Sequence, residues 1–263
     1  MKNILFGCSL TALLLLTSLT PLERRDFRIS KVVIDAGHGG KDSGAVGAIS
    51  LEKHVALKIA LELGRILQEN LKDIKVIYTR SRDEFVELER RAQIANKAGA
   101  DMFISIHCNA VPRNQDNIFG TETYVMGLHT SEANFEVAKR ENSVLLLEDN
   151  YQEVYEGFDP KSPESYILFS LYQNAYLENS LRLAEKIEHQ FQTRVGRKSR
   201  GVKQAGFLVL YRTSMPSVLV EVGYLSNKTE ERYLNDPLGQ TYLASAIFRA
   251  LRDYKNEIEQ STN

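Results

Sequence analysis

The clearest pattern along the chain is a series of short apolar runs, each bounded by polar or glycine-rich residues. The first run, residues 32–36, leads into a glycine-rich turn at residues 37–40 that contains His38. A short continuous apolar run that ends in turn residues predicts a buried strand. Similar runs predict five further strands, at residues 74–78, 101–106, 120–126, 207–210 and 217–222.

Helical periodicity fills most of the segments between these runs. Apolar residues three or four positions apart predict helices over residues 51–71, 85–98, 163–193, 229–234 and 238–258. Ser50 and Ser162 are expected to cap two helix starts, and Gly99 is expected to end the second helix. Strands that alternate with helices predict an α/β fold: a three-layer α/β/α sandwich with a mostly parallel (mixed) central sheet.

Residues 131–163 interrupt this alternation. Acidic residues outnumber basic ones there, although apolar residues such as Val144, Leu147 and Tyr151 still recur at helical spacing. We interpret the segment as a helical insertion between core elements. The predicted organisation is a single catalytic domain over residues 27–258, with the insertion inside it and a tail at 259–263.

The composition is that of a soluble globular protein and argues against one class of partner. The chain has 263 residues, of which 43% are hydrophobic and 25% charged, as in an ordinary soluble globular protein. A formal net charge of -1, with no basic stripe, argues against nucleic acid as a partner.

The first 26 residues differ from the rest. Lys2 precedes an apolar run at residues 4–19, which ends at Pro21 and a charged segment. A basic start and an apolar core shorter than the ~20 residues of a spanning helix predict a signal peptide. A retained anchor is the alternative, with membrane contact only through that uncleaved leader. With either a cleaved signal peptide or a retained anchor, we expect the domain to be periplasmic or secreted. Loss of the leader would leave Cys108 as the one cysteine, and an intramolecular disulfide would then be impossible.

Three predicted strands carry chemically capable residues at or just past their carboxyl ends: His38, His107 and Glu221. Ligands of open α/β sheets bind outside these strand ends, and Glu52, in the first turn of a helix, faces the same edge. Two histidines and a carboxylate are a common ligand set for catalytic zinc. A further carboxylate such as Glu221 can transfer protons.

Each residue also has a simpler explanation when taken alone. His38 could be a polar loop residue, His107 a hydrogen-bonded core histidine, and Glu52 an acid that favours the helix dipole. Glu221 is harder to explain structurally, because a carboxylate is costly to bury in an otherwise apolar strand. The combination of all four favours a metal site.

Four motifs carry a family resemblance. They are residues 33–40 (VIDAGHGG), 52–53 (EK), 105–110 (SIHCNA) and 220–227 (VEVGYLSN). Together they resemble the zinc-dependent N-acetylmuramoyl-L-alanine amidases of the amidase-3 family, in the family's order and within residues 31–255. One departure is Cys108, which stands where an alanine is frequent.

The resemblance implies a reaction and roles for residues. It implies one Zn²⁺ per chain held by His38, Glu52 and His107, with Glu221 as general base and acid. It implies that the substrate partner is peptidoglycan, cleaved at the amide between N-acetylmuramic acid and L-alanine. Asn109 is implied to help position the substrate.

The resemblance also suggests a regulatory role for the insertion. In cell-division amidases of this type, a helix in this region covers the zinc cleft until a partner removes it. Our hypothesis is that Glu141 or Glu148 occupies the open zinc position at rest and that an activating cell-envelope protein releases it. The competing interpretation is a solvated helix that only shapes the substrate groove.

Two other functions remain open at this point. A zinc peptidase or deacetylase acting on the cell wall would use the same ligand set. A non-catalytic peptidoglycan-binding module would have no need of both Glu52 and Glu221, which argues against that class.

Overall fold

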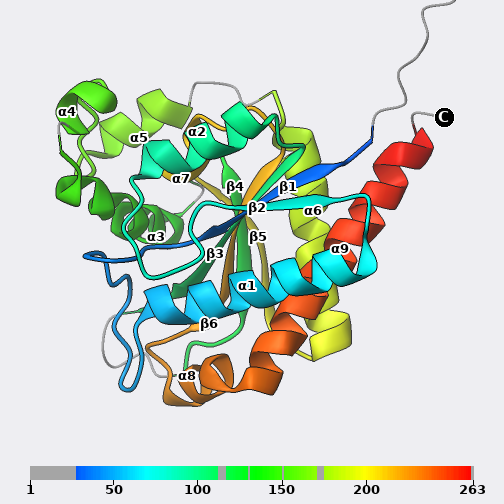
Figure 1. The fold of residues 1–263 in the computed structure, drawn as a ribbon. Helices are drawn as coiled ribbons and strands as arrows, with labels where there is room; N and C mark the ends of the chain where they lie inside the picture. Colours follow the sequence, from blue (N-terminus) through cyan, green and yellow to red (C-terminus); the bar gives the residue numbers. More distant parts are fainter. Residues whose placement is uncertain (1–27, 112–116, 130, 150, 171–174, 262–263) are drawn as a thin grey trace, which may run out of the picture.

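The core of the structure is a twisted mixed sheet. The computed structural model describes residues 28–111, 117–129, 131–149, 151–170 and 175–261, so the predicted leader at 1–26 lies outside the described residues. Within this part of the chain, the sheet has the strand order β2-β1-β3-β6-β4-β5 (Figure 1). The strands are β1 (Lys31–Ala36), β2 (Lys75–Tyr78), β3 (Met102–Asn109), β4 (Thr121–Met126), β5 (Ser199–Ala205) and β6 (Ser217–Tyr224).

The direction of the strands decides which ends meet. β2, β1, β3 and β6 pair in parallel, whereas β4 is antiparallel to β6 and parallel to β5. The predicted mostly parallel, mixed sheet is therefore confirmed. The carboxyl ends of β1, β3 and β6 share one edge, and this places the residues in and just after these ends close together.

Helices cover both faces of the sheet, as the three-layer prediction requires (Figure 1). One face carries α1 (Glu52–Asn70), α6 (Leu177–Gln190), its π-helical extension (Phe191–Val195), α8 (Lys228–Asn235) and α9 (Pro237–Ser261). The other carries α2 (Leu88–Ala98), α7 (Leu208–Tyr211), α3 (Glu132–Asn142), a 3₁₀ segment (Ser143–Leu147), α4 (Tyr151–Val154) and α5 (Pro163–Ser170).

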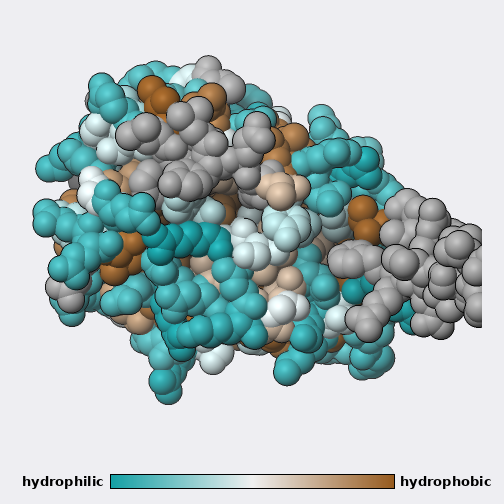
Figure 2. Space-filling model, turned by 90° about the horizontal axis from the view of Figure 1, so that it is seen from above, coloured by the Kyte–Doolittle hydropathy of each residue, from teal (hydrophilic) through white to brown (hydrophobic). Residues whose placement is uncertain are grey.

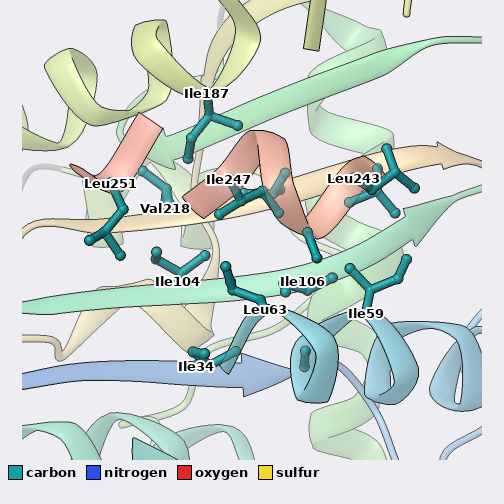
Figure 3. Packing of buried hydrophobic residues seen from close by; sticks show 14 of the residues in the cluster. Ile34, Ile59, Leu63, Ile104, Ile106, Ile187, Val218, Leu243, Ile247 and Leu251 are labelled. Atoms are coloured by element: carbon teal, nitrogen blue, oxygen red, sulfur yellow. The ribbon is translucent and has the colours of Figure 1, made fainter. Parts of the chain in front are cut away.

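Alternation along the strands sends successive side chains to opposite faces of the sheet, one largely apolar and the other of mixed apolar and polar character. Ile34, Ile104 and Val218 point to the first face, where they pack with Leu63 and Ile247 of the covering helices (Figure 3). Successive strand residues point to opposite faces, so the intervening positions belong to the second face. The second face carries most of the buried polar residues of the strands, among them Asp35, Ser105, His107, Glu122 and Glu221.

The insertion is part of the second core. Phe135 of α3 and Tyr155 are buried in the same cluster as Tyr124 of β4 and Phe207. The rings of Tyr124 and Phe207 meet edge to face at 5.0 Å, as do those of Phe135 and Tyr166. The aromatic residues of the insertion thus pack on the sheet, which makes this segment a structural layer as well as a cover for the strand ends.

Several predicted elements differ from the structure. Residues 207–210, predicted as a strand, belong mainly to the helix α7, and β5 was not predicted at all. β5 is an edge strand whose side chains are mostly half-buried and polar, so it lacks the apolar run that marks the central strands. The predicted long helix is described as two helices, α5 and α6, with residues 171–174 outside the described part. The final helix continues to Ser261, past the predicted end at residue 258.

The helix ends agree in part with the predicted capping residues. Gly99 follows α2 in the left-handed conformation (φ 58°), and the Ser165 N–H donates to Ser162 Oγ at the start of α5. Ser50 does not cap α1. Its hydroxyl donates instead to Glu231, which also accepts hydrogen bonds from the backbone N–H groups of Ile49 and Ser50.

The face of the molecule seen from above in Figure 2 is largely polar where it is coloured. Figure 2 shows hydrophilic side chains over most of the face seen there, with small separate hydrophobic patches. Among the described helices, none combines the length and the apolar character needed to cross a membrane.

The buried contact between α1 and the sheet gives a test of the core. Leu63 is fully buried, so Leu63→Ala is expected to lower the free energy of unfolding by about 2–5 kcal/mol, measured by urea denaturation. The control is Leu238→Ala, whose side chain is 55% exposed, and we expect it to change stability by less than about 0.5 kcal/mol. Equal losses in both variants would contradict this packing.

Candidate metal centre

The strand register brings the predicted residues together. His107 on β3 pairs with Glu221 on β6, and Glu221 pairs in turn with Glu122 on β4. All three side chains lie on the α2 face of the sheet. His38 follows β1 at the same edge, and Glu52 arrives from the first turn of α1. These five residues, which lie between positions 38 and 221, therefore meet near one edge of the sheet. The parallel strands β1, β3 and β6 end at this edge, the antiparallel β4 begins there, and α1 starts beside it.

Four buried side chains converge on one point: His38, Glu52, His107 and Glu141. Each offers one ligand atom, and these atoms lie within 4.8 Å of one another. His38 Nε2 is 3.1 Å from both Glu52 Oε1 and Glu141 Oε2. His107 Nδ1 is 3.1 Å and 3.0 Å from the same two oxygens. Ligands at about 2.0–2.1 Å around a tetrahedral zinc ion would be separated by roughly 3.3 Å, close to these distances.

Hydrogen bonds orient the ligand atoms toward this point. His38 Nδ1 lies 2.7 Å from Asp42 Oδ2, which leaves Nε2 for the cluster. Carboxylate–histidine pairs of this kind fix the ring of a metal-bound histidine. Among the described residues, His38 Nε2 and Glu141 Oε2 are buried without a hydrogen-bond partner. Buried polar atoms without hydrogen-bond partners are unusual in a protein core, and both of these atoms could instead be ligands of a metal ion.

Glu52 is held by the backbone around it. Its Oε1 accepts a hydrogen bond from the Cys108 N–H (2.8 Å), and its Oε2 accepts one from the Ala45 N–H (2.7 Å). Glycine gives the room for this close packing, because a Cβ at Gly44 would lie 2.5 Å from the His38 ring and 2.6 Å from Glu52 Oε2. A Cβ at Gly37 would collide with the His107 ring.

Two buried arginines fix the loop that carries His38. Arg91 donates to the carbonyls of Ala36 and His38, and Arg80 donates to those of Ala36 and Gly37. His38 has a φ of 61°, in the left-handed region that most non-glycine residues avoid. The arginines supply partners for the carbonyls of this strained turn, which keeps His38 in place.

One of these arginines, Arg91, is itself anchored by a buried acid. Asp35 Oδ1 accepts from Arg91 at 2.8 Å, while Ser105 and Thr79 hydroxyls donate to the same carboxylate. Burial alone would raise the pKa of Asp35, but Arg91 and the hydroxyl hydrogen bonds hold it below its usual value. The group is therefore a stable anion at neutral pH.

The electrostatics of the cluster favour a cation. Burial lowers the pKa of the His107 ring, but the carboxylates of Glu141 and Glu52 outweigh this and raise it to about 9. The pKa of His38 is raised well above its usual value for the same reason, with Glu52 as its strongest partner. Carboxylates that stabilise extra protons on two imidazoles would equally stabilise a divalent metal ion.

Glu221 lies beside the cluster without taking part in it. Its side chain is fully buried, and neither carboxylate oxygen has a hydrogen-bond partner in the described part of the chain. Arg140 Nη2 is 3.6 Å from Glu221 Oε1, beyond hydrogen-bond distance. Burial raises the pKa of Glu221 well above its usual value, and the negative charge of Glu141 raises it further. A carboxyl group whose pKa is raised in this way holds a proton more readily than an exposed one, as a proton-transfer group must.

The two candidate regulatory residues lie in different places. Glu141, on α3, is in the cluster. Glu148 does not reach it: its carboxylate accepts hydrogen bonds from the Leu88 N–H (2.7 Å) at the start of α2 and from the Tyr155 hydroxyl (2.8 Å). The expectation that Glu148 faces the metal position therefore disagrees with the structure, because this residue caps a helix instead.

Asn109 lies at the border of the site. Its Oδ1 accepts from Arg140 Nη2 at 3.1 Å, and its amide donates to Glu122 at 3.2 Å. It lines a cavity next to the cluster, which is compatible with the predicted contact with substrate.

Several residues that support the site were not predicted from the sequence. Asp42 carried one usable signal, because it lies four residues after His38 in the glycine-rich loop. Arg80 and Arg91 carried none, since the carbonyl groups that they bind around His38 are distant in sequence and only the folded chain brings them together.

The geometry and the four motifs together define a class of enzyme. Residues 32–253 match the N-acetylmuramoyl-L-alanine amidase family, and this match covers most of the chain. The chain belongs to this family.

Curated relatives agree with the family match. The chain is 36% identical over 227 residues to the N-acetylmuramoyl-L-alanine amidase AmiA of Escherichia coli K12, covering 85% of this chain and 75% of that protein. It is 34% identical over 229 residues to AmiC of E. coli O6:H1, covering 85% of this chain but only 52% of the relative. The chain thus spans about half the length of AmiC.

Solved structures share the fold. The amidase AmiC2 of Nostoc punctiforme has a TM-score of 0.61 and 31% identity, with coverage of 85% of this chain and 96% of that one. The catalytic domain of the amidase CwlV from Paenibacillus polymyxa has a TM-score of 0.59 and 32% identity, with coverage of 86% and 98%.

The cluster predicts selective effects on metal affinity. We expect one Zn²⁺ per chain, measured by titration calorimetry against a competing chelator. His38→Ala or His107→Ala should weaken binding by on the order of 100-fold or more, and Asp42→Asn, which acts through His38, by about 10–100-fold. His54→Ala is the matched control, because His54 is 49% exposed on α1 and pairs with Asp83. Unchanged affinity in His38→Ala would contradict the assignment.

Proposed function

We propose that this chain hydrolyses the amide bond between N-acetylmuramic acid and L-alanine in peptidoglycan, for cell-wall remodelling or daughter-cell separation. Family membership supports the reaction class. The observation that carries the proposal is the buried carboxylate of Glu221, which has no hydrogen-bond partner among the described residues and lies next to a convergent cluster of histidine and glutamate ligands.

In this proposal the cofactor is one zinc ion held by His38, Glu52 and His107. Zinc bound there would act as a Lewis acid toward the amide carbonyl and would lower the pKa of a water molecule. The backbone donors on Glu52 and the Asp42 contact of His38 hold the ligand atoms in position. Pre-organised ligands of this kind need little rearrangement during the reaction.

Glu221 is the proposed proton-transfer residue. It accepts a proton from the attacking water and delivers that proton to the leaving amine of L-alanine, so both steps use one carboxylate. Its raised pKa suits this double role, because the group holds a proton more readily than an exposed carboxylate does. Asn109 is proposed to position the substrate from the edge of the site.

Glu141 is proposed to block the site at rest. Its Oε2 lies where a fourth ligand would approach, 3.1 Å from His38 Nε2 and 3.0 Å from His107 Nδ1. Arg140 reinforces this position, because it pairs with Glu141 and donates to the carbonyl of Ala110. Substrate access would then require α3 to move.

A cell-envelope protein is the proposed partner for that movement. Leu146 and Leu147, directly after α3, are 46% and 42% exposed and offer an apolar contact on the insertion itself. The protein is proposed to be periplasmic or secreted, where peptidoglycan is accessible, and the leader is proposed to be its export signal.

The assignment of Glu221 is tested by Glu221→Gln. This variant should retain zinc but lose about 10²–10⁴-fold in kcat on purified sacculi, because it cannot transfer protons. Glu69→Gln, at an exposed position on α1, is the control and should retain full activity. Mass spectrometry of the wild-type products should find stem peptides with a free L-alanine amino group. Other cleavage products would favour a different zinc hydrolase, and a fully active zinc-loaded Glu221→Gln would overturn the mechanism.

Removal of the blocking carboxylate should activate the enzyme. Glu141→Gln is expected to raise the rate of sacculus digestion by about tenfold, which corresponds to removal of about 1.4 kcal/mol of stabilisation from the closed state. Glu132→Gln, an exposed acid in the first turn of the same helix, should leave the rate unchanged. A folded, zinc-loaded Glu141→Gln with wild-type activity would favour a helix that only shapes the groove.

A further inference from the structure

A cavity of about 570 Å³ opens beside the proposed metal centre. It begins at Asn109, two residues after His107 at the end of β3, and at Ala110, and it extends across β4 and β5 under α3. Its apolar lining includes Val111, Ile118 and Val137. Nothing in the proposed hydrolysis step itself uses this space, although it adjoins the ligands.

Two cations line the far side of this cavity. Arg200 Nε and Lys203 Nζ each lie 2.7 Å from Oε1 of Glu122. Glu122 is only 2% exposed, whereas Arg200 and Lys203 are 29% and 21% exposed. The acid is therefore buried beneath the cations, and the cations face the space above it.

An irregularity in β5 puts both cations on one side of the sheet. Residues three apart in a regular strand point to opposite faces. Here Thr121 pairs with Ser199 but Thr123 pairs with Val202, so β5 contains one extra residue at this point. Gly201, with a φ of 87°, lies inside this bulge. A bulge of this kind re-aims side chains, and here it brings Arg200 to the face of Lys203.

The cations are fixed in advance. The guanidinium of Arg200 lies 5.6 Å from the centre of the Tyr224 ring, and Lys203 Nζ lies 5.8 Å from that of Tyr124. The hydroxyls of both tyrosines also donate to Glu122. Arg200 donates to Glu122 through Nε, and that contact does not use the donors of its terminal amino groups.

The local charge is positive. Glu122 can neutralise only one of its two cations. The other charged residues that line the cavity have partners of opposite sign, because Glu136 pairs with Lys139 and Arg140 pairs with Glu141. An anionic group entering the cavity would meet one unbalanced positive charge at a partly desolvated site.

We propose that this cavity is a subsite for a carboxylate on the peptide portion of the substrate, recognised by Arg200 and Lys203. This inference rests on the proposed function. Of the two parts joined by the scissile amide, the peptide is the one that carries carboxylates close to the bond, and the apolar lining accommodates its backbone and short side chains. Arg200 and Lys203 are thus specificity-determining residues, with no part in proton transfer.

The test uses two synthetic substrates. Both are N-acetylmuramoyl-L-alanyl dipeptides, and the second amino acid carries either a free α-carboxylate or the corresponding carboxamide. Wild-type enzyme should favour the carboxylate by about tenfold in kcat/KM, mainly through KM, because a charge-assisted contact is lost in the amide. Arg200→Gln should bring the ratio close to one, and Arg200→Lys should restore part of it. Arg65→Gln, on the exposed face of α1, is the matched control and should keep the wild-type ratio.

A double variant separates charge from structure. Lys203→Gln alone removes the excess positive charge and should lose the preference. Lys203→Gln combined with Glu122→Gln leaves Arg200 unbalanced, as in the wild type, and should regain it. A merely structural role for the pair would leave the double variant no more selective than the single one. Equal rates on the two substrates in wild type, or an unchanged ratio in Arg200→Gln, would overturn the subsite.

Failure of the proposed reaction has a different signature. If neither substrate is cleaved by the wild type or by Glu141→Gln, from which the proposed block is removed, the proposed function is wrong. The subsite is then measured by calorimetric binding of the two free L-alanyl dipeptides to the zinc-loaded protein. The carboxylate form should bind about tenfold more tightly than the carboxamide. Equal affinities would overturn the subsite independently of catalysis.

Discussion

The burial of carboxylates beside two imidazoles is the constraint on which the rest of this structure depends. Glu52, Glu141 and Glu221 are almost completely excluded from water around His38 and His107. Buried negative charge is unfavourable unless cations or strong donors compensate it. Backbone N–H groups compensate Glu52 and Arg140 compensates Glu141, but Glu221 has no such hydrogen-bond partner in the described chain. The remaining imbalance is what makes the place suitable for a metal ion and for proton transfer.

The surrounding elements hold this unfavourable arrangement in place. The left-handed backbone of His38 depends on Arg80 and Arg91, and Arg91 is held by the buried Asp35 on β1. Stability contributed by the sheet is thus used to maintain a strained ligand, as is common at functional sites. The insertion adds its own aromatic core on the same face, so Glu141 arrives on a packed helix, fixed by its neighbours.

Sequence reasoning succeeded where local pattern carries the signal. The apolar runs located the central strands, and the residues at their carboxyl ends identified His38, His107 and Glu221 as companions of Glu52. It failed where the signal was tertiary. β5 is polar because it is an edge strand, whereas residues 207–210 are apolar because α7 packs on the sheet. The apolar pattern therefore predicted a strand at residues 207–210 and none at β5.

The amino-acid sequence by itself determined the fold class, the edge of the sheet at which the candidate site lies and the family. These features follow from alternation of strands and helices and from short motifs that are contiguous in the chain. Only the tertiary structure decided between Glu141 and Glu148 at the cluster, because both are acidic residues of the same insertion. In the folded chain Glu141 lies beside the two histidines, whereas Glu148 binds the start of α2. It also decided that Arg200 and Lys203 share a face, since a single extra residue in a strand reverses the side to which every later side chain points.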